Sequence, residues 1–226
     1  MPTLQIYDKL LQFPLFQGMS HDDLEIIAGH TRFGFQKVQA GKMIAKAGDT
    51  CNQLLFLING SVRVVTHADD YGYAVEEQLS SPYIFQLESI FGYHQRYTHD
   101  YTALTDVNFL MIDKEEVIRL SEDFLVFRLN LLNNFATQTQ KQVRQVWARL
   151  PQTLSERILR FFVSHCVYPA GRKEFRILMV RLADELNESR LNVSRALNDM
   201  QHSGLIVLGR GKIEIPQLER LLTISV

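Results

Sequence analysis

The sequence predicts an α+β fold in three consecutive parts: a roll of short β-strands, one long helix, and a small C-terminal domain that ends in a β-hairpin. Three observations predict it. Between residues 33 and 112, short alternating apolar runs are separated by turn residues. Residues 125–150 instead carry an apolar repeat with helical spacing. After Pro151, short helical patterns are followed by two strand-like runs around a glycine-rich turn. We therefore expect domains over residues 1–120, 121–150 and 151–226.

The N-terminal part is expected to begin with a short helix and to continue as a roll. Ser20 is followed by acidic residues, which predicts an N-cap and a helix through Ala28. Within the roll, Asn59-Gly60 separates two strand-like runs and predicts a tight hairpin turn. Many short strands at this spacing are typical of a jelly roll, in which the sheets close on themselves.

Apolar residues recur along the expected long helix with an alternating spacing of four and three: Leu125, Leu129, Leu132, Ala136, Val143, Val146 and Leu150. Thr139 is the one polar member of this repeat. The spacing is that of a coiled-coil seam, and a parallel second copy of the chain is the simplest partner for it. We expect a dimerisation helix and a homodimer; in the alternative, the seam packs on the chain's own roll. Other apolar residues remain to pack on the roll: Phe127, Leu131, Phe135 and Trp147.

Pro151 is expected to end the long helix, because proline lacks an N–H group and disfavours a helical conformation in the residue before it. The sequence from Thr153 to Glu156 then fits a capping box that starts the next helix, which is expected to run to about His165.

The segment from Leu182 to Leu197 predicts two helices joined by a tight turn. Asn187 lies in the turn, where asparagine tolerates a left-handed conformation. Val193, Leu197 and Met200 are spaced to form the buried face of the second helix. This pattern is a helix-turn-helix, in which the exposed first half of the second helix enters the DNA major groove. We expect DNA contacts from its cap and from that half: Ser189, Arg190, Asn192, Ser194 and Arg195.

Two strand-like runs follow, over residues 204–208 and 212–215, and they flank the basic tip Gly209-Arg210-Gly211. They complete a winged helix-turn-helix, and we assign Arg210 and Lys212 to contacts with DNA phosphate. In the bland alternative, this is a small helical domain whose arginines face solvent. The wing and the dimer seam together favour a regulator of transcription that binds double-stranded DNA.

Composition and charge further limit the classes of function that the chain can have. Residues 1–150 carry 13 Lys+Arg and 17 Asp+Glu, a net of −4, whereas residues 151–226 carry 11 and 8, a net of +3. No apolar stretch predicts a membrane span, and the N-terminus does not resemble a secretory signal. Cys51 and Cys166 are expected to be reduced thiols in a cytoplasmic protein. No HxH or HxxxxE set occurs between residues 33 and 112, so we expect no metal site and no enzyme of the cupin type.

The chain resembles the cyclic-AMP receptor / fumarate-nitrate regulator (Crp/Fnr) family of bacterial transcription regulators over nearly its whole length. Residues 48–62 are similar to the glycine-punctuated strands of that family, and residues 181–206 match its helix-turn-helix without gaps. The resemblance implies a cyclic-nucleotide-binding-like roll that holds an effector. It also implies that the DNA site is palindromic and that RNA polymerase is a partner. It also implies DNA reading by Arg190 and by Ser194-Arg195. Leu191 stands where the family often carries a glutamate that accepts a hydrogen bond from a base.

The expected effector pocket departs from the cyclic-nucleotide binders of that family. Those proteins carry Gly-Glu-Leu and, further along, Arg-Ser or Arg-Thr, so that a carboxylate holds the ribose and an arginine pairs with the phosphate. The corresponding residues here are Phe85-Gln86-Leu87 and Tyr97-Thr98, and Arg96 is one position out of register. We therefore expect a different small molecule or a redox signal in this pocket. Thr139 either faces that effector, as a further member of the pocket, or only sets the register of the seam.

Two alternatives stay open for the sensor. The chain is a constitutive DNA-binding dimer with a vestigial sensor, or it is a haem-based gas sensor that uses His94 or His99, with Cys51 nearby. No cofactor is expected, because the placement of histidines alone is weak evidence for haem. The chain also lacks the cysteine set of the family's iron–sulfur branch.

Overall fold

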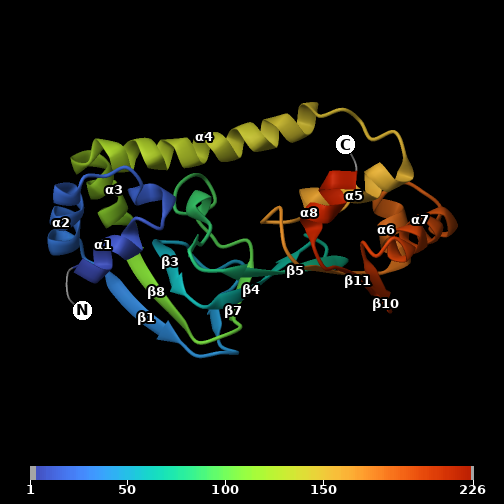
Figure 1. Ribbon diagram of the computed structural model, residues 1–226, viewed down its shortest axis with the longest axis horizontal. Coiled ribbons are helices and arrows are strands. Elements are labelled where there is room, and N and C mark those ends of the chain that lie inside the picture. The colour runs from blue at the N-terminus through green and yellow to red at the C-terminus, as the bar shows by residue number, and fades with distance from the viewer. Residues whose placement is uncertain (1–3, 225–226) are drawn as a thin grey trace. The chain divides into compact units, whose positions relative to one another are not determined.

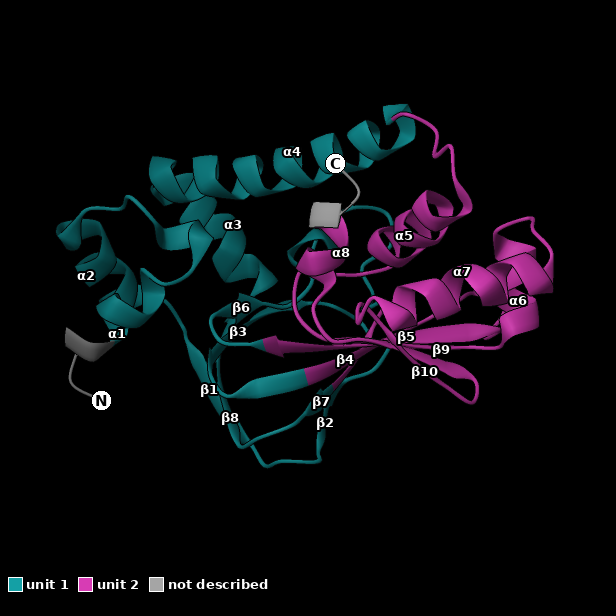
Figure 2. Cartoon of the chain, turned by 45° about the vertical axis from the view of Figure 1, so that its right-hand side comes forward, with its two compact units in different colours: residues 1–62, 80–98, 102–148 teal, residues 63–79, 99–101, 149–226 magenta. Residues whose placement is uncertain are grey.

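The structure, a computed structural model, describes residues 4–224 (Figure 1). Its contacts divide the chain into two compact units, which Figure 2 colours separately: residues 1–62, 80–98 and 102–148, and residues 63–79, 99–101 and 149–226. The units follow packing and not chain order, because the second unit includes a β-hairpin from the middle of the N-terminal part. Among the residues described, no helix is long and apolar enough to cross a lipid bilayer.

The first unit begins with two short helices joined by a 3-10 turn: α1 (Leu4–Leu10), η1 (Pro14–Phe16) and α2 (His21–His30). The Ser20 hydroxyl accepts a hydrogen bond of 3.1 Å from the backbone N–H of Asp23, which confirms the predicted N-cap. Helix α2 runs two residues beyond the expected end at Ala28.

The first sheet is antiparallel and belongs to the first unit. Its strand order is β1-β8-β3-β6, from β1 (Gly34–Val38), β8 (Val107–Asp113), β3 (Gln53–Asn59) and β6 (Tyr83–Ile84). The register pairs Phe56 with Leu110, and both residues are buried. The Phe56 ring lies edge-on to that of Phe13, with the centroids 5.1 Å apart, so the segment before η1 closes one side of this core.

The second sheet has the strand order β10-β11-β9-β5-β4-β7-β2. Its members are β2 (Met43–Ala45), β4 (Ser61–His67), β5 (Tyr73–Ser80), β7 (Asp100–Ala103), β9 (Lys173–Ile177), β10 (Val207–Gly209) and β11 (Lys212–Ile215). The two sheets and the C-terminal helices confirm the predicted α+β fold, in which a sandwich of strands precedes a helix-turn-helix with a wing.

The predicted hairpin at Asn59-Gly60 is wrong. Strands β3 and β4 adjoin there in the sequence but belong to different sheets. Gly60 has a φ of +94°, and a Cβ on it would lie 2.7 Å from the carbonyl oxygen of Asp106. The glycine therefore turns the chain from one sheet to the other at a place with no room for a side chain.

Strand β5 is an integral part of the second unit. It pairs with β9 in antiparallel register from Tyr73 opposite Ile177 to Glu77 opposite Lys173. Val75 is buried in the core that the second unit's helices form. The side chains of Glu77 and Lys173 are 0% exposed, and the carboxylate oxygen lies 2.6 Å from the ammonium nitrogen. Glu77 also accepts hydrogen bonds from the backbone N–H groups of Val167 and Tyr168, so the buried carboxylate is fully engaged.

Two helices follow β8 in the first unit, α3 (Lys114–Asp123) and α4 (Leu125–Trp147). A 3-10 turn, η2 (Leu87–Ser89), lies earlier in the chain. Phe127 and Leu131 of α4 are buried, and the Phe127 ring lies 5.4 Å from that of Phe16. Trp147, in contrast, is 84% exposed, so the suggestion that it packs on the roll is wrong.

Helix α4 ends before the last member of the predicted seam. Leu150 lies outside the helix, which ends at Trp147. A continued helix would bring the ring of Pro151 against the carbonyl group of Trp147, four residues earlier, and Leu150 is disfavoured in a helix because it precedes proline.

The second unit carries the remaining helices: α5 (Leu154–Ser164), α6 (Met179–Glu185), α7 (Arg190–His202) and α8 (Leu218–Ile224). The Thr153 hydroxyl accepts a hydrogen bond from Glu156 N–H, as the capping box predicts. The Glu156 carboxylate accepts its bond from the N–H of Gln152 and not from that of Thr153, so the reciprocal bond is made one residue earlier.

Candidate nucleic-acid interface

Helices α6 and α7 form a helix-turn-helix around a small apolar contact. Leu182 and Ala183 of α6 are buried, as are Val193 and Leu197 of α7. Asn187 has a φ of +46°, which confirms the left-handed residue expected in the turn. Ser189 accepts a 3.1 Å hydrogen bond from the backbone N–H of Asn192, so the predicted N-cap of α7 is also confirmed.

The polar residues assigned to DNA lie on the outward side of α7. Arg190, Asn192 and Arg195 are exposed together with the N-cap Ser189, and Ser194 is half-buried. Because Val193 and Leu197 point into the core, the first two turns present these side chains to solvent. The structure thus brings the five residues together, and their contact with DNA stays a prediction.

The arginines of this surface differ in their ion pairing from six other cations of the second unit. Within the described part of the chain, no carboxylate forms an ion pair with Arg190, Arg195 or Arg210. Ion pairs are formed instead by Arg157, Arg172, Lys173, Arg176, Arg181 and Lys212. The three exposed arginines are therefore available to an anion from outside the chain.

Hydrogen bonds fix the start of α7. Arg157 donates to Glu188 Oε2 at 2.8 Å and to the carbonyl of Leu186 at 3.0 Å. The other oxygen of Glu188 accepts from the backbone N–H of Ser189 and from Asn192 Nδ2 at 3.0 Å. The bonds from Ser189, Asn192 and Arg157 lower the pKa of Glu188 to about 2, so this carboxylate is ionised at neutral pH.

This network has two consequences. The Asn192 amide uses one of its two N–H groups for Glu188, which leaves the other N–H and the amide oxygen for a base. Arg157 and Glu188 act as positioning residues for the helix, and the sequence analysis did not single them out. The only sequence signal was a glutamate placed next to an N-cap serine.

The wing has the expected tip but a later start. Strands β10 and β11 pair in antiparallel register from Val207 opposite Glu214 to Gly209 opposite Lys212. The first strand was expected from Gly204, but Gly204 has a φ of +69°, which is incompatible with a strand. Arg210 is exposed at the tip. Lys212 lies 3.4 Å from Glu174 Oε2, so its charge is partly balanced within the chain.

The residues expected at the effector pocket form a closed contact in the first unit. Phe85, Leu87 and Tyr97 are buried. Gln86 is 4% exposed, with a φ of +33°. Its amide nitrogen donates to Thr98 Oγ1 at 2.6 Å, and its amide oxygen accepts from Thr98 N–H at 2.9 Å. Both ends of the Gln86 amide are thus bonded to the chain itself.

Other residues proposed for the sensor lie elsewhere. Thr139 is on the exposed side of α4, where its hydroxyl donates to the carbonyl of Phe135. Arg96 donates to the carbonyl of Gly48 at 2.6 Å. His94 is exposed, and the His99 ring bonds the Thr66 hydroxyl at 2.8 Å. Burial lowers the pKa of His99 to about 4.

Cys51 and Cys166 are free thiols, and burial raises the pKa of both groups. Of the residues that the structure describes, no three His, Cys, Asp or Glu side chains are grouped closely enough to hold a metal ion. Haem binding through His94 or His99 stays a prediction.

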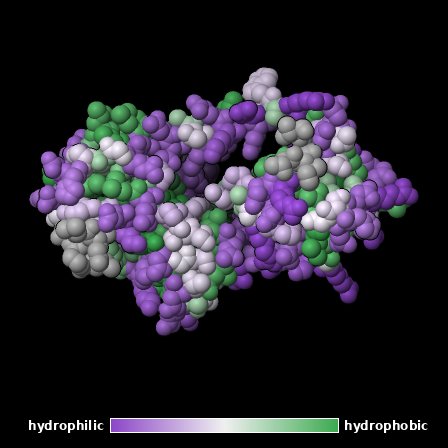
Figure 3. Space-filling view, viewed as in Figure 1, coloured by the Kyte–Doolittle hydropathy of each residue, from purple (hydrophilic) through white to green (hydrophobic). Residues whose placement is uncertain are grey.

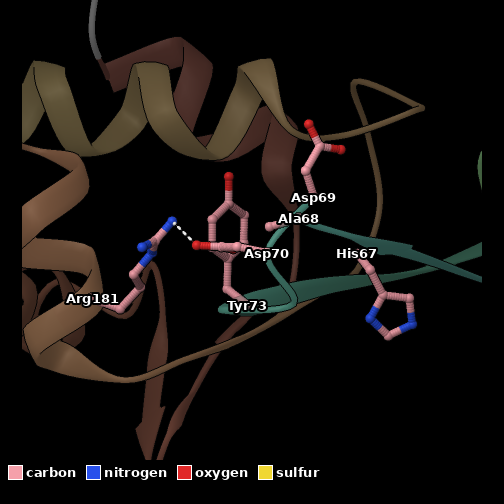
Figure 4. A pocket seen from close by; sticks show the side chains of 6 residues that line it. All are labelled: His67, Ala68, Asp69, Asp70, Tyr73 and Arg181. Carbon is pink, nitrogen blue, oxygen red and sulfur yellow. Dashed lines mark ion pairs between the residues drawn. The ribbon is translucent and has the colours of Figure 1, made fainter.

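A polar hollow in the second unit is lined by His67, Ala68, Asp69, Asp70, Tyr73 and Arg181 (Figure 4). Arg181 lies 2.8 Å from Asp70 and 2.7 Å from Glu185, so carboxylates balance its charge. In Figure 4 the His67 ring points away from that ion pair. The ion pair between Asp70 and Arg181 holds the β4–β5 turn to α6, and we assign the hollow this structural role.

Comparisons with known proteins agree with this architecture. Residues 35–124 match the family model of the cyclic nucleotide-binding domain, and residues 156–224 match that of the Crp-like helix-turn-helix domain. A comparison with curated proteins gives no match.

Solved structures share the fold. A regulator assigned to the Crp/Fnr family from Eubacterium rectale is 22% identical, with coverage of 95% of this chain and 98% of that one and a TM-score of 0.50. The sensor domain of the transcriptional regulator DNR from Pseudomonas aeruginosa is 18% identical, with coverage of 68% of this chain and 99% of that one and a TM-score of 0.52. With both domain models matched in the order that the fold requires, this chain belongs to the Crp/Fnr family of transcription regulators.

Proposed function

We propose that this protein is a homodimeric regulator, not an enzyme, that binds palindromic promoter DNA in the cytoplasm through α7 and the wing. The observation that carries the proposal is the set of exposed arginines on α7 and the wing that form no ion pair among the described residues, Arg190, Arg195 and Arg210. An arginine that faces solvent on the first half of a recognition helix has the reach to bond guanine O6 and N7 in the major groove. An arginine at a wing tip is suited to phosphate.

The dimer follows from the chemistry of α4. One face of the helix is buried in its own unit through Phe127 and Leu131. The predicted seam lies on another face, where Leu125, Leu129, Leu132, Val143 and Val146 are between 48% and 76% exposed. Figure 3 shows hydrophobic side chains exposed over the first turns of α4. A second copy of α4, packed in parallel, would cover this stripe. The two recognition helices of a dimer that binds a palindromic site lie about one DNA turn, roughly 34 Å, apart.

The dimer has a direct test. Val143→Asp together with Val146→Asp would put four charges into a dry seam, which should raise the dimer dissociation constant by roughly a thousandfold or more. Sedimentation should show a dimer for the parent chain and a monomer for this variant. Thr137→Asp, on an exposed position off the seam, should remain dimeric. A parent chain that is monomeric at a protein concentration of roughly tens of micromolar would contradict the proposal.

We further propose that the roll responds to a signal other than a cyclic nucleotide. The buried Gln86 carries no charge, and its amide is bonded at both ends to Thr98. A ribose and a cyclic phosphate would have to break those bonds without gaining a carboxylate or a paired arginine. Titration calorimetry with cyclic AMP should therefore give no binding heat, and a micromolar dissociation constant would contradict the proposal.

The signal itself would act by differential affinity for two states of the dimer, since binding alone shifts no equilibrium. A thermal-shift screen separates a sensor that is still functional from a constitutive DNA-binding dimer with a vestigial sensor. An absorption spectrum of protein purified without oxygen tests the haem alternative. RNA polymerase is the partner expected at the promoter.

The test of DNA binding is a selection on random double-stranded DNA, followed by fluorescence anisotropy on the selected site. We expect a palindromic site and an affinity that falls steeply with salt, because phosphate contacts release counterions. Arg190→Ala combined with Arg195→Ala should remove the preference at the base positions that these two arginines read. A chain that selects no sequence, or a double variant that keeps the preference, would contradict the proposal.

A further inference from the structure

Helix α7 exposes one large apolar side chain in its first turn. Leu191 is 60% exposed and is flanked by the exposed polar residues Arg190 and Asn192. It is absent from the buried core of the second unit, in which Val193 and Leu197 of the same helix are fully buried. Single exposed leucines are common on protein surfaces, so exposure alone assigns no role. The role of Leu191 follows instead from its position on the helix.

Leu191 points away from the core. Successive residues of a helix are rotated by about 100°, so Leu191 lies about 200° from the buried Val193. Arg195 follows four residues after Leu191 and occupies the same outward stripe. If α7 enters the major groove, Leu191 and Arg195 face the base edges together, within about two base pairs of one another, because four residues span about 6 Å of helix.

The residues beside Leu191 already supply polar contacts. Arg190 and Arg195 are donors, and Asn192 keeps its amide oxygen as an acceptor and one N–H as a donor, since only one of its N–H groups is bonded to Glu188. Leu191 has no donor or acceptor. The methyl group of thymine is the apolar feature that the four bases present in the major groove. A leucine packed against the amino group of cytosine, or against the acceptors of guanine, would leave those polar groups without a partner.

We propose that Leu191 is a specificity-determining residue, which packs on the 5-methyl group of one thymine in each half-site. The proposal rests on the proposed function, since it requires α7 to lie in the major groove. It assigns to one side chain both a favourable contact with thymine and the rejection of cytosine and guanine at that base. Of the described side chains on the outward stripe of α7, Leu191 is the one that can make an apolar contact with the thymine methyl group.

The experiment removes the two halves of the contact separately. The full-length protein is first used to select its site from random DNA. Each thymine of that site is then replaced, in both half-sites, by deoxyuridine, which lacks only the methyl group. Anisotropy at fixed salt should show one position at which this replacement weakens binding, by about fourfold for one half-site and about fifteenfold for both. That position should lie within about two base pairs of the one affected by Arg195→Ala.

The protein variants complete the cycle. Leu191→Ala should bind the thymine and uracil sites equally, whereas Leu191→Met, which keeps an apolar side chain, should retain the preference for thymine. Ile26→Ala is the matched control, because it shortens an exposed aliphatic residue on α2 in the first unit. It should retain the full effect of the methyl group. Folding of Leu191→Ala is not at risk, since the side chain is exposed and alanine favours a helix.

The outcomes are distinguishable. A parent chain that selects no DNA sequence would overturn the proposed function. A chain that binds its selected site but shows no uracil effect near the Arg195 position would overturn only the role of Leu191. So would a selected half-site without thymine there, or a Leu191→Ala variant that still distinguishes thymine from uracil.

Discussion

The sheet and the recognition helix of the second unit differ in the burial and pairing of their charged side chains. In the sheet, Glu77 and Lys173 are fully buried and lie 2.6 Å apart. On α7 and the wing, Arg190, Arg195 and Arg210 are exposed without an ion-pair partner among the described residues. A buried charge must find its partner within the chain, because desolvation costs several kcal/mol per ion. An exposed cation has no such need and remains available to bind. Variants in the two regions should therefore fail differently. Those in the sheet should lose stability, and those in the helix should lose affinity for DNA.

The largest effect is expected from Glu77→Gln. This variant leaves the Lys173 ammonium buried without its carboxylate, which should lower the free energy of unfolding by about 3–5 kcal/mol. Urea denaturation followed by circular dichroism measures the change. Arg176→Gln is the matched control: Arg176 pairs with Glu76 on the same two strands, but its side chain is 55% exposed, so its loss should cost less than about 1 kcal/mol.

A double variant sharpens this test. Glu77→Gln combined with Lys173→Met removes both charges and should recover most of the lost stability, because no buried charge is then left unpaired. Equal losses in Glu77→Gln and Arg176→Gln would show that the strand pairing of β5 with β9 does not bury this ion pair in solution.

His99 extends the comparison to pH. Burial lowers its pKa from 6.5 to about 4, so the unfolded chain takes up a proton before the folded chain does. The stability is therefore complete above about pH 6.5 and is lost as the pH falls from 6.5 towards 4, by at most about 3 kcal/mol. His99→Asn keeps a hydrogen-bonding partner for Thr66 but does not titrate. Urea midpoints across this range should fall more steeply for the parent; identical slopes in both proteins would contradict the assignment.

Local signals predicted the structure well where adjacent residues determine it. Ser20, Thr153 and Ser189 cap helices, and Asn187 takes the left-handed conformation, because each effect involves residues within one helical turn. The heptad spacing also separated the exposed residues of α4 from the buried Phe127 and Leu131, although Trp147 is exposed and Leu150 lies beyond the helix.

Features that depend on distant residues were missed or wrong. The Asn59-Gly60 turn was predicted as a hairpin because its sequence specifies a sharp bend but not which strands pair. The buried pair of Glu77 and Lys173 joins residues 96 positions apart, and neither residue differs in the sequence from a solvated charge. At the candidate DNA surface, residue types predicted α7 and the wing tip, whereas the fixing of α7 by Arg157 and Glu188 needed the fold.

On the recognition helix, Arg195→Ala should leave stability within about 0.5 kcal/mol of the parent, because its side chain is exposed and forms no ion pair among the described residues. Loss of a bidentate contact with guanine should weaken binding to the selected site by about 1–3 kcal/mol and relax the preference at one base position. Repeating the selection with the variant reads both effects. Asn198→Ala, exposed further along α7, is the control and should keep the parent preference. Unchanged preference in Arg195→Ala would place this arginine with the solvated charges.

The smallest effects are expected on the wing, where Lys212 has an ion-pair partner and Arg210 has none among the described residues. Arg210→Ala should weaken all DNA sequences alike and lower the slope of log Kd against log salt by about one unit, as expected for one lost phosphate contact. Lys212→Ala should act in the same sense but less, because Lys212 must leave Glu174, 3.4 Å away, to reach a phosphate. Glu174→Gln should accordingly strengthen binding slightly in the parent and have no such effect in Lys212→Ala. Anisotropy titrations over a series of salt concentrations compare the slopes. A change in the preferred base with either wing variant, or a larger slope change for Lys212 than for Arg210, would show that pairing within the chain does not predict which cations bind DNA.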